Sequence, residues 1–130
     1  VCAAVALRAQ QLMQERDVIG HVRSVTPTFA GHVASMGQYD FIGNVRSIGL
    51  IGAMEFTADK NSYQKFDKSH KIAAHAVAII QKHGVILRAL PGDIIGFCPP
   101  LIISKVELDD MFKRIHDAML EIAELAAKLR

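Results

Sequence analysis

The sequence predicts an α+β fold in which a small, mainly antiparallel sheet is covered by helices. Segments with strand periodicity alternate with segments of helical periodicity along the chain. Pro91-Gly92 joins two short apolar runs as a tight turn, and such a turn connects antiparallel neighbours. The segment after residue 104 has the clearest helical pattern. The 130 residues suffice for one domain with a real core, and no linker divides them. We therefore expect a single domain over residues 1–130.

The first two segments have helical periodicity. Residues 1–17 place apolar side chains on one face, at Val5, Ala9, Leu12 and Met13. The chain begins with Val and opens directly into this pattern without an N-cap, as expected for a fragment of a longer protein. Residues 18–40 continue with helical spacing, but Pro27 interrupts them. Because proline removes a backbone donor and clashes with the preceding turn, we expect two helical pieces with a break or kink near Thr26-Pro27.

Residues 44–57 predict one strand. Apolar side chains alternate there, with Gly52 in phase. Gly49 and Gly52 are unfavourable in a strand and indicate a bulge or a close approach of backbone or ligand. The polar segment that follows, to about residue 67, is expected to be a loop.

A helix is predicted over 69–83, with Gly84 as its C-terminal stop. Strands over 85–90 and 94–98 then flank the Pro91-Gly92 turn, so residues 85–98 form a hairpin. Pro99-Pro100 ends this hairpin because proline cannot donate to a ladder.

The last helix has the strongest local signals. Ser104 and Glu107 have the spacing of a capping box. A helical apolar stripe follows, which we assign to the core and not to a cofactor site: Leu108, Met111, Phe112, Ile115, Met119, Ile122 and Leu129.

Composition excludes several functions. Hydrophobic residues make up 51% of the chain, charged residues 22%, and the net charge is +2 without any run of like charges. Nothing favours nucleic acid or a membrane surface as a partner. No segment has the length of a membrane span, and we expect no signal peptide. The two cysteines form no disulfide framework, so a reducing, cytoplasmic location is expected. Cys98 is expected to be a small buried side chain.

Motif searching yields few candidates for chemistry. There is no glycine-rich phosphate loop and no serine in a nucleophile-elbow context. The histidines lack zinc spacing with a third ligand, so we expect no metal site and assign them to the surface: 21, 32, 70, 75, 83 and 116.

Arg88 is the exception, because it interrupts the apolar strand just before the turn. A guanidinium in such a strand needs a partner or solvent. It could lie at an edge, or pair with Asp93 or Glu55. The functional alternative is a planar fork that binds a carboxylate through two hydrogen bonds.

Three segments together resemble the class III, omega-type aminotransferases. Residues 84–119, GVILRALPGDIIGFCPPLIISKVELDDMFKRIHDAM, are similar to the closing segment of that family. Residues 45–56, VRSIGLIGAMEF, resemble its VRG-x-GL-x-x-x-EF strand, and residues 1–7 resemble the stretch after its SGHP-type motif. The matches occur in family order and span nearly the whole chain.

The resemblance implies the small C-terminal domain of a homodimeric, fold type I transaminase. Such an enzyme moves an amino group between an amine or omega-amino acid and a keto acid such as pyruvate, with pyridoxal phosphate as cofactor. The lysine that binds the cofactor would lie upstream, in a large domain that this chain lacks. No lysine here matches that motif, so the isolated chain is expected to bind no cofactor, to hold no catalytic residue and to be inactive.

The resemblance also gives Arg88 a role. In the amine and beta-alanine:pyruvate branch, an arginine at this strand position binds the substrate carboxylate. In the ornithine and GABA branch the arginine stands later, in an R-F-A-P-P context, where this chain has Gly96. This departure favours the pyruvate-using branch.

The alternatives to a transaminase domain are a stand-alone ligand-binding or regulatory module and a dimerisation domain. We also expect self-association, because the first helix should expose apolar surface.

Overall fold

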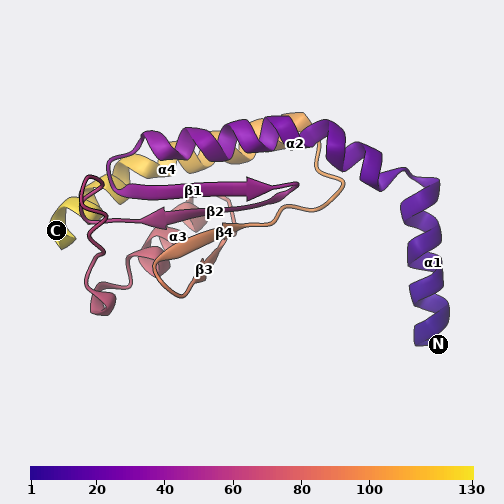
Figure 1. Ribbon diagram of the computed structural model, residues 1–130, viewed down its shortest axis with the longest axis horizontal. Helices are drawn as coiled ribbons and strands as arrows, with labels where there is room; N and C mark the ends of the chain where they lie inside the picture. The colour runs from indigo at the N-terminus through magenta and orange to yellow at the C-terminus, as the bar shows by residue number, and fades with distance from the viewer.

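The computed structural model describes residues 1–130 and has the predicted α+β architecture (Figure 1). The helices are α1 (Cys2–Glu15), α2 (Val18–Ser35), α3 (Ile72–Lys82) and α4 (Lys105–Leu129). The strands are β1 (Ile42–Ile48), β2 (Ile51–Phe56), β3 (Arg88–Leu90) and β4 (Ile94–Phe97). Short 3-10 turns cover Met36–Gln38 and Lys68–His70. The four strands form one antiparallel sheet in the order β1-β2-β4-β3, so β1 and β3 are the edges.

The segment predicted as one strand is a hairpin of β1 and β2, so that prediction was wrong. The chain reverses at Gly49-Leu50, and Ile48 pairs with Ile51. Gly49 has φ +56, and tight hairpin turns require this positive φ. Ile48 and Ile51, which flank the turn, are both exposed, and the predicted alternation holds along β2, where Met54 is fully buried.

The hairpin of β3 and β4 around Pro91 is confirmed, but its ladder is shorter than predicted. Residues 85–87 lead into β3 without pairing, and β4 ends at Phe97. The position beyond Cys98 is Pro99, followed by Pro100. Because neither proline can donate a hydrogen bond, the ladder cannot extend further along this side.

Helix α2 runs without a break through Pro27, so the predicted division into two pieces was wrong. Proline removes one backbone hydrogen bond, but the helix has compensating contacts. Val25 and Phe29, on either side of Pro27, are both buried in the same core. The Thr26 hydroxyl also donates to the carbonyl of Val22 at 2.8 Å. Packing along one continuous face thus outweighs the local preference of proline.

Helices α2, α3 and α4 cover one face of the sheet, and α2 and α4 lie side by side over it (Figure 1). The inward side chains of β2 and β4, such as Met54, Phe56 and Phe97, belong to a core of 25 buried residues. Helix α4 supplies the largest share of that core from any helix. Its predicted capping box is confirmed, with Ser104 and Glu107 bonded reciprocally.

Helix α1 projects from the body of the molecule (Figure 1). None of its residues is buried, and the side chains of Val5 and Leu7 are more than half exposed. The expectation that the first helix exposes apolar surface is confirmed. No helix combines the length and apolarity that crossing a membrane would require.

Candidate functional site

Arg88 ends a row of four residues that crosses the whole sheet. On β3 it pairs with Gly96 of β4, which pairs with Ala53 of β2, which pairs with Arg46 of β1. Residues directly opposite each other in a ladder project to the same face. The two arginines therefore share the face that the helices leave open, one on each edge strand.

The open face is hollowed between these arginines. A groove of about 430 Å³ runs over Ala53 and Gly96, with an arginine at either end. The rest of its wall is mostly apolar and includes Ile48. Gly96 carries no side chain and Ala53 only a methyl group, so the floor stays low. We define this hollow, from Arg46 to Arg88, as the open-face groove.

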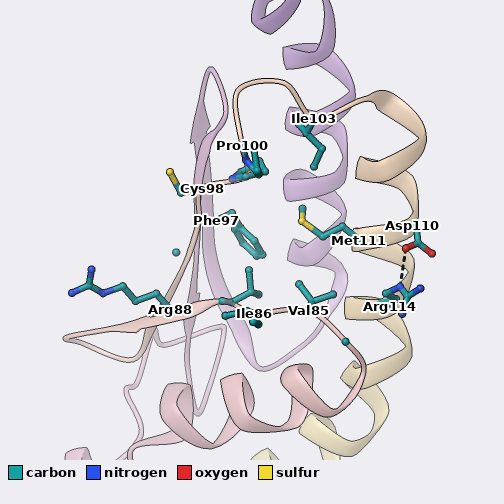
Figure 2. Close-up of a pocket in the computed structure, with 14 residues that line it drawn as sticks. Val85, Ile86, Arg88, Phe97, Cys98, Pro100, Ile103, Asp110, Met111 and Arg114 are labelled. Carbon is teal, nitrogen blue, oxygen red and sulfur yellow. Dashed lines mark hydrogen bonds and ion pairs between the residues drawn. The ribbon is translucent and has the colours of Figure 1, made fainter. Parts of the chain in front are cut away.

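Figure 2 shows how the side chains divide between the two faces. Arg88 and Cys98 extend to one side, away from the helices, whereas Phe97 points to the other side, toward Met111 of α4. The expectation that Cys98 is buried was wrong: its thiol is exposed. It follows Phe97 by one position, and adjacent residues in an extended segment face opposite ways.

The guanidinium of Arg88 has no hydrogen-bond or ion-pair partner in the structure. Both proposed partners are engaged elsewhere. Glu55 pairs with Arg46 at 3.3 Å and with Lys65. Asp93 faces the start of α3, where its carboxylate lies 3.5 Å from the amide nitrogen of Ala73. Of the structural alternatives, only the exposed edge position agrees with the structure, and it leaves Arg88 able to bind an anion.

A larger cavity of about 670 Å³ lies on the far side of β3, between residues 84–88, the segment after β4 and helix α4 (Figure 2). Its wall contains no histidine, lysine or serine. Its two other charged residues, Arg114 and Asp110, form an ion pair with each other, with Nε of Arg114 2.8 Å from Oδ2 of Asp110. Apart from Arg88 at its border, the cavity holds no unpaired charged group that could act on a substrate.

The histidines are less exposed than expected. Three of them form hydrogen bonds between segments that are distant in sequence. His116 of α4 lies 2.7 Å from the Tyr39 hydroxyl and 3.2 Å from the Ser35 hydroxyl. His32 of α2 pairs with Asp109 of α4 at 2.7 Å. Burial, and to a smaller extent the nearby His32, lowers the pKa of His116, and burial raises the pKa of Tyr39. These contacts hold α2 against α4 and lie away from the groove.

A third histidine, His21, bonds the backbone carbonyl of Ile103 at 2.8 Å and so fixes the segment that leads into α4. Sequence spacing gave no sign of these contacts, because the partners are 77 to 82 residues apart. No group of three or more His, Cys, Asp or Glu residues is arranged to hold a metal ion.

The lysines do not provide a site for pyridoxal phosphate. All eight are exposed. A lysine that forms a Schiff base is activated by desolvation or by a neighbouring cation. Lys65 is in addition bound to Glu55. The residues of this chain therefore do not fit the cofactor.

Comparison with known proteins agrees with this arrangement. The sequence model of the class-III aminotransferases matches residues 1–119. The chain belongs to the class-III aminotransferase family. A gamma-aminobutyrate transaminase 1, mitochondrial, of Oryza sativa is 32% identical over 100% of the chain and 25% of its own length. An uncharacterized aminotransferase of Sinorhizobium fredii is 33% identical over 98% of the chain and 28% of its own length.

Solved structures of aminotransferases share the fold. The PMP-bound form of an aminotransferase from Vibrio fluvialis superimposes with a TM-score of 0.88 at 27% identity, over 98% of this chain and 27% of that one. The class-III chain described here spans about a quarter of the length of the curated relatives it matches.

Proposed function

We propose that this chain is the C-terminal small domain of a pyridoxal-phosphate-dependent transaminase, and that Arg88 binds the substrate carboxylate. The parent enzyme would transfer an amino group between an amine or omega-amino acid and a keto acid such as pyruvate. The observation that carries the proposal is the unpaired guanidinium of Arg88 at the end of the open-face groove. Family membership and the small share of each relative that the chain covers support the assignment to one domain of a larger enzyme.

The chemistry of Arg88 is recognition and orientation. Its planar guanidinium can donate two parallel hydrogen bonds to a carboxylate, which fixes both position and direction. Because Arg88 lies on an edge strand and its guanidinium has no partner, the side chain can also move aside for an uncharged substituent of the substrate. Binding of this kind orients a substrate whose reacting carbon lies in another domain. The cofactor itself supplies an electron sink when bound.

Gly96 favours the pyruvate-using branch over the ornithine and GABA branch. It lies directly opposite Arg88 in the ladder, so an arginine at position 96 would project onto the same face, one strand nearer the middle of the sheet. A Cβ atom there would be close to the flexible end of Leu90, at 3.2 Å, and in ordinary contact with the Arg88 carbonyl oxygen, at 3.9 Å. The two branches would thus place one guanidinium at neighbouring positions of the same row. In this chain position 96 is a glycine, and Arg88 supplies the positive charge.

The Arg88 proposal is tested by titrating the chain with pyruvate while recording backbone amide and arginine side-chain signals by NMR. We expect saturable shifts around Arg88 that disappear in Arg88→Gln. Arg23→Gln, an exposed arginine on α2 without an ion-pair partner, should bind like the unaltered chain. If Arg88→Gln keeps the same shifts as the unaltered chain, Arg88 does not bind the carboxylate.

The chain alone is proposed to be inactive and to form no cofactor adduct. Its eight lysines are exposed, so none has the desolvated surroundings of a Schiff-base lysine. Incubation with pyridoxal phosphate followed by borohydride should give no stoichiometric lysine adduct by mass spectrometry. One adduct per chain at a single lysine would refute this part of the proposal.

We further propose that the parent enzyme is a cytoplasmic homodimer and that this chain self-associates. The exposed apolar side chains of α1, among them Val5 and Leu7, support association, since large exposed apolar surfaces usually mark interfaces. Two free thiols support a reducing compartment. Sedimentation should show association that weakens in Leu7→Glu. A strictly monomeric chain at high concentration would contradict it.

A further inference from the structure

Arg46 gives the open-face groove a second guanidinium. It lies in the same cross-strand row as Arg88, on the opposite edge strand. Neighbouring strands are about 4.8 Å apart, so three spacings separate the two Cα atoms by roughly 14 Å. Both side chains are long enough to lean inward over Ala53 and Gly96. The distance between the two guanidinium groups can therefore match a small molecule.

The charge around Arg46 is not balanced by its partners. Arg46 donates to Asn44 at 3.1 Å and to Glu55 at 3.3 Å. Glu55 is also bound by Lys65, so one carboxylate is shared by two cations. If Arg46 turns toward a ligand, Glu55 keeps Lys65 as its partner and no buried charge is left unpaired. Arg46 is thus available to an anion, and its half-exposed side chain can reach one.

The groove between the arginines is mostly apolar. Ile48, Ile51 and Leu90 line most of it together with the two small floor residues, and the uncharged polar side chains in its wall are Ser47 and Cys98. A ligand that fits this arrangement carries a negative group at each end and a short hydrocarbon chain between them.

We propose that the open-face groove binds a dicarboxylate, with Arg88 on one carboxylate and Arg46 on the other. This inference rests on the proposed role of Arg88 and extends the substrate class from monocarboxylates to acids with a second carboxylate. Arg46 is then a specificity-determining residue. It lowers the dissociation constant of a dicarboxylate, whereas a monocarboxylate bound at Arg88 does not reach it.

The test compares glutarate, adipate and pimelate with the straight-chain monocarboxylates of equal carbon number. Dissociation constants are measured by NMR titration of the 130-residue chain. Because exposed ion pairs contribute modestly, we expect one dicarboxylate length to bind about three- to fivefold more tightly than its monocarboxylate. Arg46→Gln should abolish this ratio while the monocarboxylate dissociation constant read from the amide signals around Arg88 stays unchanged. Arg46→Lys should keep part of it, and Arg23→Gln should keep all of it.

The outcomes separate this inference from the role of Arg88. If Arg88→Gln weakens all ligands but Arg46→Gln leaves the ratio intact, the carboxylate site at Arg88 stands and the dicarboxylate groove is refuted. If every dicarboxylate binds like its monocarboxylate, the groove is also refuted. If Arg88→Gln affects no ligand, both proposals fail. Unchanged amide shifts far from the sheet in each variant show that the fold is retained.

Discussion

Replacing Phe112 by alanine should destabilise the domain more than any surface change. Phe112 lies where α2, α4 and β4 meet and is fully buried. Its ring contacts Phe29 with centroids 6.0 Å apart, contacts Phe97 at 5.5 Å and stacks on His32 at 4.8 Å. A buried Phe→Ala change costs about 3–5 kcal/mol through lost burial and the cavity it leaves. Typical domains are stable by about 5–15 kcal/mol, so Phe112→Ala should lose a large part of the free energy of unfolding.

Urea unfolding followed by circular dichroism measures this cost. Phe112→Leu keeps most of the buried volume but loses the aromatic ring geometry, so it should cost about 1–2 kcal/mol, less than Phe112→Ala. Leu120→Ala, on the exposed side of α4, should change stability by no more than about 0.5 kcal/mol. A loss below about 1 kcal/mol in Phe112→Ala would refute the assignment of this residue to the centre of the core.

Three further predictions concern the packing, the helix capping and the pH dependence of the fold. Gly52→Ala should lower the free energy of unfolding by about 1–3 kcal/mol, because its Cβ would lie 3.0 Å from Val33 in the core. Gly31→Ala, with nothing within 4 Å, should raise it by about 0.5–1 kcal/mol; the reverse order in urea unfolding would be inconsistent with this packing. Ser104→Ala removes the cap of α4 and should cost about 1 kcal/mol, measured in the same way; an unchanged unfolding midpoint would contradict the cap. Burial lowers the pKa of His116 below its ordinary 6.5, so the unfolded chain binds a proton more readily than the folded one. The stabilisation is present above pH 6.5 and is lost as pH falls through the folded pKa. Unfolding midpoints at pH 7.5 and pH 5 should therefore differ less in His116→Asn than in the unaltered chain, and an equal difference would rule this out.

Elements with local signals could be predicted from the sequence. The turn at Pro91-Gly92 and the capping box at Ser104 each depend on residues within a few positions of one another, and both are present. Pro27 shows the opposite case. Its local preference is for a break, and only the core that both halves of α2 share keeps the helix continuous. That core involves residues far away in the chain.

The site was predicted in part. Arg88 stands out because it is charged within an apolar strand, and that signal is local. Its alignment with Arg46 depends on the register of four strands, and this register is not determined by any short segment. For the same reason, neither the exposure of Cys98 nor the pairing of Glu55 with Lys65 could be derived from spacing.

The position of the two arginines on the edge strands has a consequence for solubility. The outer strands of an open sheet present unpaired backbone groups, onto which a strand of another molecule can add, and this is a common start of aggregation. A charge on an outer strand discourages such addition. β3 is also only three residues long, and Pro99 and Pro100 follow its neighbour β4. Arg46 and Arg88 would therefore protect the sheet when no ligand is bound, so a variant that lacks both should aggregate more readily than either single variant.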